Sequence, residues 1–177
     1  MKGIEMHCTQ CEAPAAGKSK YCTTHRAEAR ARFKAMCEES KVVAAQRDTA
    51  HSEVFTRTQY AATEAFKACD PTPMVVYEAE GLTDRPKDGG KAWYVGEGVC
   101  GFASVIITPA TSSFAKWLNR SNIGHKNYGG GWHVSVYNLV EESKSSQSYE
   151  RKVAAARAAV QVLKDAGISA YVWDRLD

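Results

Sequence analysis

The residues best suited to chemistry are three cysteines and a histidine near the amino terminus. Cys8 and Cys11 are separated by two residues, and after ten further residues Cys22 and His25 repeat that spacing. Two intervening residues let a tight turn aim both side chains at one ion, and a tetrahedral Zn²⁺ ion needs two such pairs. All four ligands would come from the protein, which leaves no coordination position for a catalytic water. The pattern therefore predicts a structural zinc site.

The first of these pairs has a second interpretation as a thiol–disulfide redox motif. Metal binding is favoured, because no β-α-β pattern surrounds Cys8 and Cys11 and the second pair follows at a distance typical of metal ligands. The chain has six cysteines, and a reducing compartment would keep them as thiols. Cys37, Cys69 and Cys100 have no partner spacing and are interpreted as small hydrophobic residues that are buried or half-buried.

Two elements must position the four ligands: a short hairpin and the start of a helix. Residues 12–21 contain proline and glycine and are long enough for a small hairpin. Cys22 and His25 would then lie in the first turn of the helix that follows. Residues 1–25 are therefore predicted to form a treble-clef-like zinc finger.

Residues 26–70 are predicted to form a long helix or a helical hairpin, because residues 26–69 contain no glycine or proline. Small and apolar residues recur at spacings of three and four, with an interruption at Arg47, and a hairpin would break near Asp48. This stripe is too thin to form a core of its own. The helix must pack on the second domain, on itself or on a partner chain, which includes a homodimer.

A predicted linker or long loop at residues 71–91 separates this helix from an α+β domain at residues 92–177. Two helices alternate with three strands in the order β-α-β-α-β, which predicts a two-layer α+β sandwich: a mixed sheet with both helices on one face. The helices are expected at residues 111–120 and 149–165, the strands at 101–108, 131–138 and 168–173, and one or two further strands at 75–77 and 92–95.

Composition excludes several classes of protein. The 177 residues are 44% hydrophobic, 10% aromatic and 24% charged, which is typical of a globular chain and not of a disordered or collagen-like one. No apolar run reaches the roughly 18 residues of a membrane span, and the first residues lack the hydrophobic stretch of a secretory signal. We expect a cytoplasmic protein with no membrane partner.

A net charge of +3 does not by itself indicate a nucleic-acid-binding protein. Residues 1–36, however, carry seven basic and three acidic side chains, and no acidic residue lies between Glu97 and Glu141. A zinc module that presents a basic helix face commonly contacts phosphates, although the same residues also suit a solvated helix face. The candidate residues for nucleic-acid or anion binding are Lys18, Lys20, Arg26, Arg30, Lys116, Arg120, His125, Lys126, Arg151 and Lys152.

A glycine-rich loop at residues 124–131 precedes a strand with alternating side chains. Successive glycines expose backbone N–H groups that could hold an anion, but a flexible hairpin connection is favoured, and the loop matches no nucleotide-binding fingerprint. In the strand, His133 and Ser135 alternate with Trp132 and Val134, so one face belongs to the core. The other face, if uncovered, could stack bases or hold a polar ligand.

Several short motifs resemble a family of small bacteriophage proteins. They are Cys100-Gly-Phe-Ala-Ser-Val, Ser113-Phe-Ala-Lys-Trp-Leu118, the glycine-rich loop, Gln147-Ser-Tyr-Glu-Arg-Lys152 and Asp174-Arg-Leu-Asp177. The resemblance covers about half the chain, and Ser104 stands where the family pattern has tryptophan. The segment from Cys8 to Arg26 separately resembles short zinc fingers of actinobacterial phages. These resemblances imply a phage protein that works in the host cytoplasm, and they supply no activity.

The motifs of the resembled family also single out polar residues that hydrophobic packing does not require, and these are candidates for ligand binding. Arg151 and Lys152 fall in the first turn of a predicted helix, where the helix dipole disfavours cations, so this pair invites an anionic partner. Ser148 is equally explained as the N-cap of that helix, and Arg175 with Asp177 as a salt bridge near the end of the sequence. A polar cluster at a ligand site would comprise His133, Gln147, Ser148, Arg175 and Asp177.

No catalytic set is identifiable among the side chains: neither paired carboxylates nor a Ser-His-Asp or Cys-His arrangement. We therefore predict a phage-encoded, non-enzymatic accessory protein with a structural Zn²⁺ ion that binds nucleic acid or a host nucleoprotein complex. One alternative is an inhibitor of a host or anti-phage defence protein that acts through protein–protein contacts. Another is a small-ligand-binding protein or an enzyme that uses His125, His133 and the glycine-rich loop.

Overall fold

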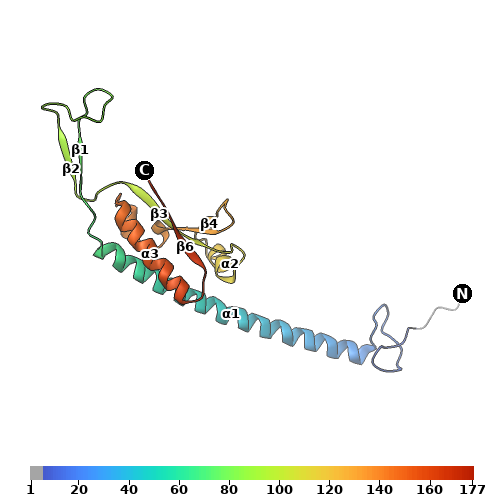
Figure 1. Ribbon diagram of the computed structural model, residues 1–177. Helices are drawn as coiled ribbons and strands as arrows, with labels where there is room; N and C mark the ends of the chain where they lie inside the picture. Colours follow the sequence, from blue (N-terminus) through green and yellow to red (C-terminus); the bar gives the residue numbers. More distant parts are fainter. Residues whose placement is uncertain (1–5) are drawn as a thin grey trace. The chain divides into compact units, whose positions relative to one another are not determined.

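The computed structural model describes residues 6–177, and its contacts group the chain into two compact units, one ending at Thr49 and the other spanning Ala50–Asp177 (Figure 1). The fold is of mixed helix and strand, as predicted. Its elements are α1 (Thr23–Ala68), β1 (Met74–Tyr77), β2 (Ala92–Val95), β3 (Gly101–Ile107), α2 (Ser113–Arg120), β4 (His125–Lys126), β5 (Trp132–Ser135), η1 (Val136–Asn138), η2 (Glu141–Lys144), α3 (Tyr149–Asp165) and β6 (Ala170–Leu176).

The long helix α1 is continuous, so the helical hairpin considered for residues 26–70 does not form. Its apolar stripe is used in the part that belongs to the second unit, where spacings of three and four residues keep the side chains on one face. Earlier along the helix, Phe33, Met36 and Val43 are exposed. The buried side chains of α1 are Phe55, Thr58, Ala62 and Phe66.

The main sheet has four strands in the order β4-β5-β3-β6, and each neighbouring pair is antiparallel. The predicted mixed sheet is therefore wrong. The cause is the short strand β4, which the sequence pattern does not reveal: it reverses the chain once more between α2 and β5. Each helix then links two parallel strands that have one other strand between them, as in the β-α-β-β-α-β arrangement.

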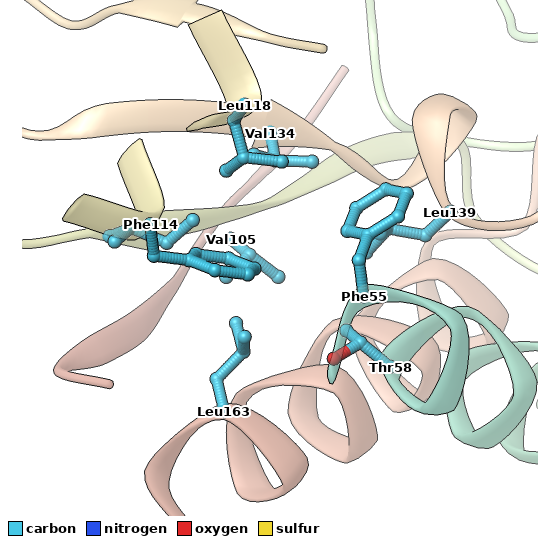
Figure 2. Close-up of a pocket in the computed structure, with 9 residues that line it drawn as sticks. Phe55, Thr58, Val105, Phe114, Leu118, Val134, Leu139 and Leu163 are labelled. Carbon is cyan, nitrogen blue, oxygen red and sulfur yellow. The ribbon is translucent and has the colours of Figure 1, made fainter. Parts of the chain in front are cut away.

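The hydrophobic core lies between one face of this sheet and helices α1, α2 and α3. Alternate residues of β3, namely Ala103, Val105 and Ile107, point into it. A small cavity of about 10 Å³ remains at its centre. Figure 2 shows the side chains around this cavity, which include Phe55 and Thr58 of α1, Phe114 and Leu118 of α2, Leu163 of α3, and Val105, Val134 and Leu139.

The opposite face of the sheet has no helix over it within residues 6–177, because all three α-helices contribute to the core. Strand register assigns to this face the residues that alternate with the core positions of β3, β5 and β6. We call it the outer face; it comprises Phe102, Ser104, Ile106, His133, Ser135, Tyr171, Trp173 and Arg175.

The further strands expected at residues 75–77 and 92–95 are confirmed as β1 and β2, and the long loop expected within residues 71–91 joins them as an antiparallel hairpin. Two strand boundaries differ from the sequence prediction. Strand β5 ends at Ser135 because the Ser135 hydroxyl accepts a hydrogen bond from the Tyr137 N–H and starts a 3₁₀ turn. Strand β6 extends to Leu176, since it pairs with the whole of β3. The predicted domain boundary at residues 71–91 stays a prediction.

Candidate metal centre and outer face of the sheet

The four predicted metal ligands lie together at the start of the described chain. A backbone hydrogen bond from Cys8 N to Ala13 O, 2.9 Å long, closes the turn that carries Cys8 and Cys11. Cys22 directly precedes α1, and His25 lies in the first turn of this helix. His25 therefore lies in the first helical turn, as predicted, whereas Cys22 lies one residue before the helix and not within it.

The distances between these ligand atoms match those around a single tetrahedral ion. The Sγ atoms of Cys11 and Cys22 are 3.8 Å apart. The Nδ1 atom of His25 lies 3.3 Å from the Sγ of Cys8 and 3.4 Å from that of Cys22. Bonds of about 2.3 Å to sulfur and 2.0 Å to nitrogen predict edges of about 3.8 and 3.5 Å for a tetrahedral site. All four ligand atoms lie within 4.8 Å of one another, so the cluster can hold one metal ion.

The cysteines of this cluster are free thiols, not a disulfide, and their surroundings shift the pKa values of Cys8 and Cys11 in opposite directions. Burial acts to raise the pKa of Cys8, but hydrogen bonds from backbone amides, that of Cys22 foremost, and from the His25 ring lower it to about 6. The thiolate is the metal-ligating form of cysteine. A backbone hydrogen bond at Ala13 acts to lower the pKa of Cys11, but burial and the neighbouring Cys22 and Cys8 thiols raise it above its ordinary value.

The basic residues predicted for nucleic-acid contact in this unit are exposed. Arg26 and Arg30 are one turn apart on α1. Lys20 lies over the ring of Tyr21, with its Nζ 5.3 Å from the ring centroid, and Lys18 is exposed in the same hairpin. These four side chains are open to an anionic partner, and their role stays a prediction.

A row of aromatic rings crosses the outer face of the sheet. The ring centroids of His125 and His133 are 4.6 Å apart, and those of His133 and Trp173 are 6.1 Å apart. These rings come from β4, β5 and β6, so they meet over the central strand β3, where Ser104 and Ile106 are buried. The Nδ1 atom of His133 is buried without a hydrogen-bond partner among the described residues.

The glycine-rich loop allows the rings of His125 and His133 to lie close together. Gly124 has a φ of +76°, and a Cβ at this position would collide with the backbone carbonyl of His133. A residue without a side chain therefore lets β4 approach β5 closely. The loop connects the two strands of a hairpin, as favoured from the sequence, and it brings His125 opposite His133.

Two exposed aromatic residues and a stacked cation complete the outer face. The side chains of Tyr171 and Trp173 are 47% and 42% exposed. The guanidinium of Arg175 lies 5.0 Å from the centroid of the Phe102 ring. Phe102, Tyr171 and Trp173 were not placed on this face from the sequence. The alternation of side chains along β3 and β6 could have indicated that these residues share one face. That inference needs the full extent of β6, and the strand predicted from the sequence ends too early.

The structure does not bring the other predicted residues to this face. Lys116 and Arg120 are exposed on α2, which packs on the opposite face. Lys126 is exposed and pairs in register with Trp132. Arg151 lies 4.0 Å from a carboxylate oxygen of Glu97.

The polar residues predicted around the start of α3 do not form one cluster: Ser148 caps the helix, and others line a pocket. The Ser148 side chain accepts a hydrogen bond from Arg151 N, so Ser148 is the N-cap of α3. Gln147, Lys152 and Asp177 line a pocket together with Tyr137.

His133 gives the stability of the fold a pH dependence that can be measured. Burial, and secondarily the charge of His125, lowers the pKa of His133 below its ordinary 6.5. As pH falls through about 6.5, the unfolded chain takes up this proton before the folded one, so the folded state loses stability. We expect the free energy of unfolding to fall between about pH 7.5 and pH 5.5, and to fall less in a His133→Gln variant. Urea denaturation at both pH values tests this, and an equal loss in both proteins would contradict it.

Comparison with protein-family models, with curated proteins and with solved structures finds no match to this chain. Among the described residues, no helix has the length and apolar character needed to cross a membrane.

Proposed function

We propose that this chain is a zinc-stabilised, non-enzymatic protein of phage origin that binds single-stranded nucleic acid on the outer face of its sheet. The observation that carries the proposal is the outer face itself. It presents Phe102, Tyr171 and Trp173 with the cation of Arg175, on a sheet that no described helix covers there.

Aromatic side chains on an open sheet are suited to unpaired bases. Bases stack on exposed rings whatever their sequence, and four-stranded sheets that bind RNA use this contact. Duplexes hide the faces of their bases, so stacking favours single strands. The charge agrees, because no acidic residue lies between Glu97 and Glu141, a segment that contains β3, β4 and β5. A phosphate backbone can approach this part of the chain with little repulsion.

We assign the metal as Zn²⁺ held in a treble-clef-like finger by the Cys8, Cys11, Cys22 and His25 cluster. The support is the ligand set and the tetrahedral distances, which suit zinc better than the oxygen-preferring ions. Four protein ligands make the ion structural. Lys18, Lys20, Arg26 and Arg30 would then add sequence-independent phosphate contacts from the finger and the start of α1.

Substitution of the exposed rings tests the proposed function. We expect Trp173→Ala and Tyr171→Ala each to weaken binding of a labelled single-stranded oligonucleotide by about 5- to 150-fold, since a stacked base contributes about 1–3 kcal/mol. Fluorescence anisotropy at fixed salt measures the affinity. Tyr94→Ala is the matched control, because Tyr94 is 72% exposed but lies on β2, outside the four-stranded sheet.

Several outcomes of this experiment would contradict the proposal. They are affinity unaffected by salt, equal affinity for duplex and single strand, or ring substitutions that leave binding unchanged. Removal of phosphate contacts in Arg26→Ala, Arg30→Ala or Lys126→Ala should instead reduce the salt dependence of binding.

One observation favours the alternative of a protein-directed inhibitor. Phe33, Met36 and Val43 are exposed on α1 within the first unit, and a protein partner or a second copy of the chain would bury them. Recovery of a specific partner that survives nuclease, together with no binding to oligonucleotides, would favour this second function.

A further inference from the structure

A buried lysine near the start of α3 has no described carboxylate as its partner. Lys152 is 3% exposed. Its Nζ donates to the backbone oxygen of Gly101 at 2.9 Å and to the hydroxyl oxygen of Tyr137 at 3.3 Å. It also lies 5.5 and 5.2 Å from the ring centroids of Phe102 and Tyr137. Moving an ammonium group out of water without a counter-ion costs much free energy. A bound anion beside Lys152 would offset this cost.

The hydrogen-bonding capacity of this pair is incompletely used. An ammonium group has three N–H donors, and the contacts of Lys152 Nζ use two of them. The Tyr137 oxygen accepts from Lys152, which leaves its own O–H proton to donate elsewhere. One N–H of Lys152 and the O–H of Tyr137 therefore remain as donors, on two atoms that lie 3.3 Å apart. A charged donor beside a neutral one is an arrangement suited to an oxyanion.

These donors border a pocket of about 280 Å³. The pocket adds the side-chain amide of Gln147, whose oxygen accepts a hydrogen bond from Cys100 Sγ and whose N–H₂ group is a further donor. Lys144 also lines it and pairs with Glu141 at 2.6 Å. Asp177 is the acidic residue of the lining, and no ion pair joins it to Lys152 among the described contacts. The pocket is large enough to admit a phosphate group.

Phe102 connects this pocket to the outer face of the sheet. One cation, Lys152, contacts its ring from the pocket, and another, Arg175, contacts it from β6. A nucleotide whose base lies along the outer face would therefore carry its phosphate to within reach of Lys152.

We propose that this pocket binds a phosphate group between the ammonium of Lys152 and the hydroxyl of Tyr137. The choice of phosphate over carboxylate rests on the proposed function, whereas the need for an anion rests on the buried ammonium alone. The ligand would be a nucleotide or the phosphate of a nucleic-acid strand.

The test uses the full zinc-loaded chain and follows its backbone amide resonances by NMR. Inorganic phosphate, adenosine 5′-monophosphate, adenosine and acetate are titrated separately. We expect phosphate and the nucleotide to shift the amides of Gly101, Phe102 and Gln147, and the nucleotide to bind more tightly than phosphate alone. Adenosine should act on the outer face without shifting the amide of Gln147.

Two variants examine the donors, and a third is the control. Tyr137→Phe removes only the hydroxyl and should weaken phosphate binding about tenfold, because a hydrogen bond to a charged group is lost. Lys152→Met removes the charge at similar volume and should abolish saturable binding. Lys164→Met removes an exposed lysine in the last turn of α3, outside the pocket, and should change the affinity little. If Lys152→Met fails to fold, Tyr137→Phe still decides the question.

The proposal is overturned if phosphate leaves the pocket amides unshifted, if acetate binds as tightly as phosphate, or if Tyr137→Phe keeps the full affinity. Its failure is distinguishable from failure of the proposed function. Oligonucleotide binding that depends on Trp173 but not on Tyr137 would contradict the phosphate pocket and support the outer face as the binding surface. Phosphate binding at Lys152 without oligonucleotide binding would support the pocket and contradict the proposed function.

Discussion

Removal of the metal ion from the Cys8, Cys11, Cys22 and His25 cluster should unfold this segment and leave the Ala50–Asp177 unit folded. We expect this result because Cys8 and Cys22 are the only residues from 6 to 49 that the structure describes as buried. This segment has no apolar core to order it without the metal, although a few backbone hydrogen bonds link its turns. In zinc-finger peptides, metal binding contributes about 10–16 kcal/mol to folding. The effect on this segment should be all or none.

Limited trypsin digestion measures this prediction at Lys18 and Lys20, which lie between the two ligand pairs. Both sites should be protected in the zinc-loaded protein and cleaved rapidly after chelation or in a Cys22→Ser variant. Cys37→Ser is the matched control, because Cys37 is a half-buried thiol on α1 outside the cluster. Continued protection of Lys18 and Lys20 in zinc-free protein would show that the metal does not hold this segment together.

Truncation of Phe55 should cost the second unit about 3–5 kcal/mol of its free energy of unfolding. This side chain is 8% exposed, its ring centroid lies 5.8 Å from that of Trp117, and it lines the core cavity (Figure 2). In Phe55→Ala the existing cavity enlarges, since the surrounding helices cannot close it completely. The loss also weakens the attachment of α1 to the sheet.

Chemical denaturation followed by tryptophan fluorescence measures the change, because all of the tryptophans lie in the second unit. The matched control is Phe33→Ala on the same helix, where the side chain is 69% exposed and the expected change is near zero. Equal losses in the two variants would mean that Phe33 is buried in solution, as in a dimer formed through α1.

The sequence was informative where a local pattern determines the structure. Helix α3 begins after the Ser148 cap and ends at Asp165, as predicted, because capping and an amphipathic repeat lie within one segment. The metal cluster was equally readable, since both ligand pairs have a spacing that a single turn enforces. The continuity of α1 was not readable, because a stripe this thin fits one helix or two.

The remaining features depend on contacts between distant segments. Strand β4 has two residues, too few for any periodic signal, and it exists because β5 pairs with it. The burial of Lys152 depends on a carbonyl group 51 residues away in the sequence, whereas a lysine in an amphipathic helix is ordinarily placed on the exposed side. The antiparallel sheet and the buried charge could therefore not be derived from the sequence alone.

The buried serine on the central strand leaves room for two neighbouring rings. Ser104 is 3% exposed beneath the place where the rings of His133 and Trp173 approach each other. A large residue at position 104 would occupy the space in which those rings meet. Tryptophan at position 104 should therefore be tolerated only together with smaller side chains at positions 133 or 173.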